Sequence, residues 1–149
     1  MSTATDLYER DFYAWAMHNA GLIRQGRLAE VDLGNVAEEL ESMGRSERRE
    51  LESRLEALLM HLLKWRYQPQ RRGRSWRNTI RVQRFDAGKV LSANPSLRPQ
   101  LPAILEDAYW KARLLAAGET GLEEETFPEA CPFTLNQVLD EHFWPAEAQ

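Results

Sequence analysis

Residues 33–67 read LGNVAEELESMGRSERRELESRLEALLMHLLKWRY and carry apolar side chains at helical spacing. Val36, Leu40 and Met43 follow one another at i, i+4 and i+7, which places them on one face of a helix. Because the phase of this stripe does not reset at Gly44, the pattern predicts one long helix. Two shorter helices that meet at that glycine are the alternative. After one polar interruption the stripe continues through Leu51, Leu55, Leu58, Leu62 and Trp65.

The segments on either side of this helix are also predicted to be helical. Apolar side chains recur at helical spacing over about residues 6–24, and Gly26 follows where a helix end is expected. Asp32 is a suitable N-cap for the long helix, and Pro69 ends it, because a proline cannot continue the hydrogen-bond ladder. With Ser75 and Thr134 as N-caps, further helices are expected over about residues 75–93, 99–118 and 134–141.

No segment alternates between apolar and polar residues as a strand would, so the sequence predicts an all-α fold. We expect a single domain over residues 1–149, built as an antiparallel bundle of about five helices around the long central one. The longest apolar runs are too short to span a membrane, and residues 1–21 lack the pattern of a signal peptide. With one cysteine, Cys131, no internal disulfide can form, so a cytoplasmic location is expected.

Charge is distributed unevenly along the chain. The 149 residues hold 19 basic and 23 acidic side chains, a formal net charge of −4. Residues 45–89 carry 13 basic and 5 acidic side chains, whereas residues 106–149 carry 2 basic and 10 acidic ones, and residues 1–44 carry 3 and 8. The mild total is therefore a cancellation between a basic middle and acidic ends. The cancellation takes place either within one chain or between the chain and a partner.

Several strings along the chain resemble a known family. They include YERDFYAW at residues 8–15, EELESMGRS at 38–46, HLLKW at 61–65 and FWP at 143–145. In this order they resemble the bacterial family of domains of unknown function numbered twenty-nine. That family has no established activity, substrate or cofactor. The resemblance therefore implies a helical fold and supplies no catalytic residues.

The basic stretch from residue 64 to residue 84 is the strongest candidate for a binding site, because it holds eight cations and no acid. Cations neutralise phosphates, and aromatic residues such as Trp65, Tyr67 and Trp76 can stack on unpaired bases. The competing interpretation is that the cations pair with acidic residues within the fold or across an interface, and the acidic isoelectric point favours it. The candidate residues are Lys64, Arg66, Arg71, Arg72, Arg74, Arg77, Arg81 and Arg84.

Two further patterns raise the question of catalysis. Arg54 and His61 lie seven residues apart on one helix face, a spacing that resembles the Arg/His site of a helical ribonuclease superfamily. A half-buried structural histidine is the competing interpretation. No Glu precedes a His by three residues, so the carboxylate metal site of helical bundles is not expected, nor is any cofactor.

The sequence therefore predicts a small interaction protein without a recognisable catalytic motif. We expect it to act through a protein partner or by association with a second copy. The alternative is a protein directed at RNA or single-stranded nucleic acid, with the basic residues 64–84 as its binding surface.

Overall fold

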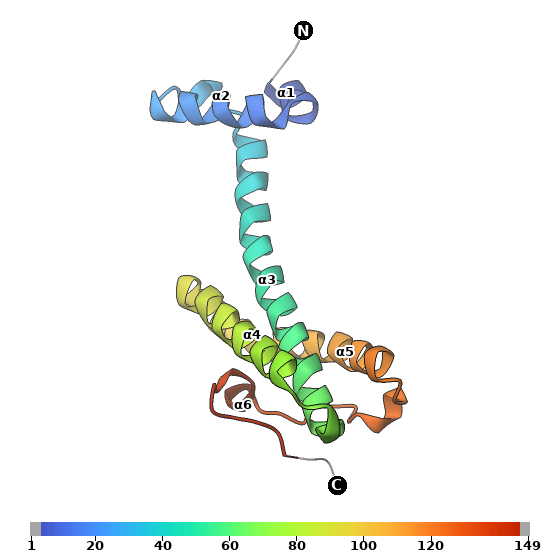
Figure 1. Ribbon diagram of the computed structural model, residues 1–149. Helices are drawn as coiled ribbons and strands as arrows, with labels where there is room; N and C mark the ends of the chain where they lie inside the picture. Colours follow the sequence, from blue (N-terminus) through green and yellow to red (C-terminus); the bar gives the residue numbers. More distant parts are fainter. Residues whose placement is uncertain (1–3, 147–149) are drawn as a thin grey trace. The chain divides into compact units, whose positions relative to one another are not determined.

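The computed structural model describes residues 4–146, and within that range it contains helices and no strand (Figure 1). This confirms the predicted all-α helical bundle. The six α-helices are α1 (Ala4–Arg10), α2 (Phe12–Arg24), α3 (Leu33–Tyr67), α4 (Arg74–Ala93), α5 (Leu101–Thr120) and α6 (Leu135–Leu139). Short 3-10 turns connect them at Leu28–Glu30, Pro69–Arg71, Pro95–Gln100 and Glu124–Thr126.

The long helix α3 runs without a break for 35 residues, so the prediction of one helix through Gly44 is confirmed. Asp32, the predicted N-cap, directly precedes this helix. Asp32 accepts a hydrogen bond from the Asn35 side chain at 2.9 Å and another from the Trp15 indole at 3.0 Å. The bonds from Asn35 and from Trp15 hold the pKa of the Asp32 carboxyl below its usual value.

The first predicted helix, over residues 6–24, is wrong in one respect, because the chain breaks at Asp11 into α1 and α2. Asp11 leaves the helical region, with φ −149°, and its side chain accepts a hydrogen bond from the Ala14 amide at 3.0 Å. A short acidic side chain that caps a new helix competes with continuation of the old one. The apolar spacing hides this break, because the rings of Tyr8, Phe12 and Trp15 still contact one another across it.

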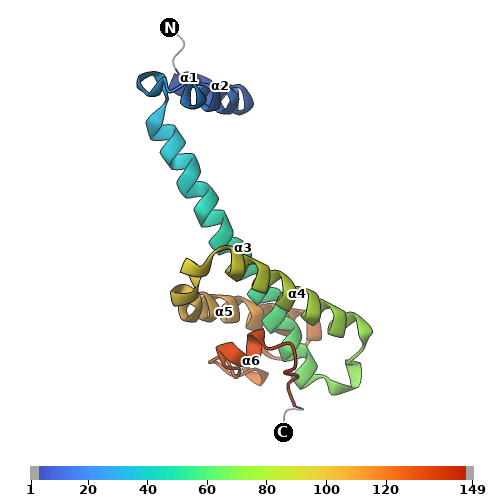
Figure 2. The ribbon, with the colours of Figure 1, turned by 90° about the vertical axis from the view of Figure 1, so that its left-hand side faces the viewer.

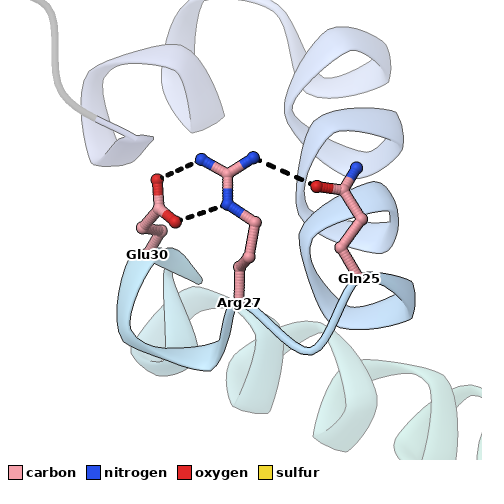
Figure 3. A network of polar contacts seen from close by, with 3 residues as sticks. All are labelled: Gln25, Arg27 and Glu30. Carbon is pink, nitrogen blue, oxygen red and sulfur yellow. Dashed lines mark hydrogen bonds and ion pairs between the residues drawn. The ribbon is translucent and has the colours of Figure 1, made fainter.

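The chain divides into two compact units, residues 1–46 and residues 47–149. The expectation of a single domain over residues 1–149 stays a prediction. In the part of the first unit whose side chains the structure describes, residues 6–46, the buried apolar side chains are Trp15, Leu22 and Val31. Between α2 and α3, Gly26 has a positive φ of 74°, and Arg27 then donates two hydrogen bonds of 2.6 Å to Glu30 and one of 3.0 Å to Gln25 (Figure 3). This exposed network fixes the connection between the two helices.

The second unit holds the main hydrophobic core. In both ribbon views α4 and α5 lie beside the C-terminal half of α3, and α6 lies near them (Figures 1 and 2). The helix α4 begins at Arg74, with Gly73 rather than the expected Ser75 as its N-cap, and α6 begins with the predicted Thr134 in a capping box with Gln137. The fully buried leucines of α3 in this core are Leu51, Leu55, Leu58, Leu59, Leu62 and Leu63.

Candidate interaction surfaces

The eight cations between residues 64 and 84 divide into two groups of four, and the first group is used inside the second unit. Lys64 is buried, forms an ion pair of 2.6 Å with Glu119 and lies 4.9 Å from the centre of the Trp76 ring. Arg72 donates to the Trp65 carbonyl at 2.6 Å and stacks over the Trp65 ring. These cations stabilise the fold, as do Arg66, which lies over Tyr67, and Arg84, which bonds to two backbone carbonyls.

The second group consists of Arg71, Arg74, Arg77 and Arg81, and all four side chains are exposed. Within residues 4–146 the structure records no ion pair or side-chain hydrogen bond for any of them. Arg74, Arg77 and Arg81 are spaced i, i+3 and i+7 along α4, so they follow one face of that helix. The competing interpretation of internal pairing therefore describes only half of the basic block. The other half is exposed. Its three members on α4, which are Arg74, Arg77 and Arg81, are called the arginine row below.

A groove of about 950 Å³ lies beside the arginine row, between α4 and the segment of residues 139–144. On the α4 side it is lined by Asn78, Arg81, Val82 and Phe85, and Phe85 is 67% exposed. On the other side its lining includes His142 and the half-buried Trp144. The sequence did not identify Phe85 or the groove. The signal available in the sequence was an aromatic residue, Phe85, at helical spacing from Arg81 on a mainly polar face.

Arg84 closes one side of this groove. It is 94% buried, and its Nε and Nη2 donate to the carbonyls of Val138 and Gln137 at 2.9 and 3.2 Å. Its guanidinium lies 5.7 Å from the centre of the Trp144 ring. The third nitrogen, Nη1, is buried and has no hydrogen-bond partner. A buried donor without a partner is costly, so Arg84 keeps an unused hydrogen-bond donor within the wall of the groove.

The aromatic residues that were expected to stack on bases lie elsewhere. Trp65 is buried and its ring lies 4.7 Å from that of Trp144, while Tyr67 packs edge-on against the buried Phe127. Trp76 is half-buried beneath Lys64. These three residues belong to the core or its edge, because their positions are in phase with the apolar stripes of α3 and α4.

A second candidate surface lies in the unit of residues 1–46. Leu33, Leu40 and Met43 on α3 are between 61% and 64% exposed, and Val36 between them is only half-buried. We call these four residues the open stripe. Contiguous exposed apolar residues of this kind are typical of surfaces that bind another protein.

Arg54 and His61 have separate partners in the structure. Arg54 forms ion pairs with Asp86 at 3.4 Å and Glu50 at 3.6 Å, and His61 Nδ1 is 2.9 Å from the Ala57 carbonyl oxygen. Burial lowers the pKa of His61, so the imidazole is neutral at pH 7. An arginine already neutralised by two carboxylates offers less positive potential to a scissile phosphate.

No group of three or more His, Cys, Asp or Glu side chains that could hold a metal ion occurs within residues 4–146. The Cys131 thiol lies 3.4 Å from the Phe133 carbonyl, and burial raises its pKa. In the same range, none of the helices combines the length and the apolar character that crossing a membrane requires.

The family described as "Domain of unknown function DUF29" matches residues 7–144. No curated protein and no solved structure matches the chain. Since the matched residues cover nearly the whole chain and agree with the resemblance noted in its sequence, the chain belongs to the DUF29 family.

Proposed function

We propose that the protein is a non-enzymatic interaction module that associates with a second copy of itself through the open stripe of α3. The observation that carries this proposal is the difference in exposure along one continuous apolar stripe. Leu33 and Leu51 are 18 residues apart, as are Leu40 and Leu58, and 18 residues make five full turns of an α-helix. Leu51 and Leu58 are fully buried, whereas Leu33 and Leu40 are 61% and 62% exposed.

The positions of the charged side chains around the open stripe favour a helix-to-helix contact that excludes water. Glu38 and Glu41 form ion pairs with Arg45 at 3.1 and 3.6 Å. At about 100° per residue Glu38 and Arg45 lie on the side of α3 opposite to Leu40, and Glu41 lies at the edge of that side. Ala37 and Gly44, which flank the stripe, are small and exposed, so the backbone of another helix can approach closely. A helix pair would therefore bury apolar side chains and leave Glu38 and Glu41 in water, while Glu39, which borders the stripe, accepts a hydrogen bond from the Tyr8 hydroxyl.

The small core of residues 1–46 also supports a partner at this place. Within residues 6–46 only Trp15, Leu22 and Val31 are buried apolar side chains, and segments of this size often need a further stabilising contact. A second copy fits because the stripe is self-complementary. In an antiparallel arrangement Leu33 of one copy lies opposite Met43 of the other, and Val36 lies opposite Leu40. Such a two-fold pairing satisfies the symmetry of most homodimers.

Sedimentation velocity over concentrations from about 2 to about 200 µM tests this proposal. We expect the wild-type protein to reach twice the 17.3 kDa mass of one chain as the concentration rises. Leu40→Glu should keep the protein monomeric across the range, because it puts a charge into the helix contact. Glu38→Gln, on the opposite side of α3, is the matched control and should associate like the wild type. A wild-type chain that stays monomeric at the highest concentration overturns the proposal, as does a Leu40→Glu variant that still associates.

A further inference from the structure

A different surface, in the unit of residues 47–149, has the properties of a binding site for a linear anion. The arginine row runs along α4 for about 10 Å, since each helical residue adds about 1.5 Å. Its three guanidinium groups are exposed and have no acidic partner within residues 4–146. Arginines in a row can contact successive phosphates of one strand, and each contact releases bound counterions.

The groove beside the row adds aromatic surface to this charge. Phe85 follows Arg81 by four residues, so it continues the same helix face, and its ring is 67% exposed. Trp144 forms part of the groove wall opposite α4. The same wall also includes the carboxylate of Glu141, so the positive charge comes from the α4 side of the groove. Exposed arginines beside accessible aromatic rings are the arrangement by which proteins hold single-stranded nucleic acids without reading their sequence.

Arg84 lines the groove, and one of its nitrogens is buried without a hydrogen-bond partner. The residue is 94% buried and two of its three nitrogens are already bonded, so its position is fixed before any ligand arrives. The remaining donor, Nη1, can bind a phosphate or a base oxygen that enters the groove after a small rearrangement of its wall. A fixed donor loses little conformational freedom on binding.

The acidic isoelectric point does not argue against an anionic ligand once the charges are assigned to the two units. Residues 1–46 hold 4 basic and 8 acidic side chains, whereas residues 47–149 hold 15 of each. The whole net charge of −4 therefore belongs to the first unit. The unit that contains the groove is neutral overall, and its arginine row forms a local positive surface.

We propose that this groove binds single-stranded nucleic acid, with its phosphates on Arg74, Arg77 and Arg81 and its bases on Phe85 and Trp144. Nucleic acid engages both features along its whole length, since every nucleotide carries a phosphate for the arginines and a base that can stack on an exposed aromatic ring. The size of the groove, about 950 Å³, lies within the range of known ligand sites. This site is separate from the open stripe, so either proposal can fail without the other.

Fluorescence anisotropy with labelled oligouridylate and oligothymidylate of about 12 nucleotides tests the inference, in salt from about 20 to about 200 mM. The double variant Arg77→Gln/Arg81→Gln should weaken binding at least fivefold and reduce the slope of log K against log salt by about 1.4. The matched control is Arg24→Gln/Arg98→Gln, which removes two exposed arginines outside the groove and should bind like the wild type.

Phe85→Ala should weaken binding between about fivefold and a hundredfold, with no change in the salt slope, because it removes stacking and no charge. The side chain is largely exposed, so this variant keeps the fold. The inference is overturned if neither oligonucleotide binds at the lowest salt concentration, or if the two double variants lose equal affinity. It is equally overturned if oligoglutamate of the same length binds more tightly than the oligonucleotides, since the groove would then recognise an acidic protein segment.

Discussion

His61 connects the stability of the core to pH. Its ring is half-buried on α3, and burial lowers its pKa below the usual value of about 6.5. The bond to the Ala57 carbonyl opposes this shift without overcoming it. Between the lowered folded-state pKa and about 6.5, the unfolded chain binds more protons than the folded chain. The free energy of unfolding should therefore decrease as the pH falls from 7 through this range.

Urea unfolding at about pH 7, 6 and 5 measures this effect. We expect His61→Gln to flatten the decrease that the wild type displays, because glutamine does not titrate. His142→Gln is the control, since His142 is exposed at the surface and its removal should leave the decrease unchanged. If wild type and His61→Gln have the same pH dependence, burial does not determine the protonation of this histidine.

At the scale of helices, α3 provides a comparison of two leucines in the same rotational position. Leu58 is fully buried and Leu40 is 62% exposed. Leu58→Ala should lower the free energy of unfolding by about 2–5 kcal/mol, because it leaves a cavity in the core. Leu40→Ala should change it by less than about 0.5 kcal/mol at concentrations at which the chain is monomeric. Chemical denaturation of the two variants measures the difference, and equal losses would mean that both positions are covered.

The sequence predicted the helices because their apolar periodicity is long and strong, as on α3. It missed the break at Asp11, since the side chains on either side keep nearly the same phase and only the cap reveals the interruption. The sequence located the basic residues 64–84, but it did not predict which of them pair within the fold and which stay exposed. Whether Lys64 meets Glu119, or Arg84 meets the carbonyls of residues 137 and 138, depends on residues 53 to 55 positions away. Pairing over such distances is decided by packing, which composition does not encode.

At the scale of the whole molecule, the two units differ in how much apolar surface they bury. Among residues 6–46 three apolar side chains are buried, whereas the core of the second unit includes six fully buried leucines of α3 alone. Local stability follows such burial, so amide hydrogens in the first unit should exchange faster than those in the second.

Hydrogen exchange read by mass spectrometry at about 1 and about 100 µM protein checks this difference. Exchange in residues 33–43 should slow at the higher concentration if a second copy covers the open stripe, while exchange in the buried part of α4 should stay the same. Leu40→Glu is the control and should exchange equally fast at both concentrations. Uniform protection of both units would contradict the expected order of stability.

The pairing of Trp65 with Trp144 has an optical consequence. The two indoles lie with centroids 4.7 Å apart and their planes at 43°, close enough for their electronic transitions to couple. Trp144 also lines the groove beside α4, so a stacked base or a displaced side chain there would alter both the coupling and the emission. The protein thus carries an intrinsic chromophore at its own candidate binding site, and near-ultraviolet circular dichroism can follow occupancy without an attached label.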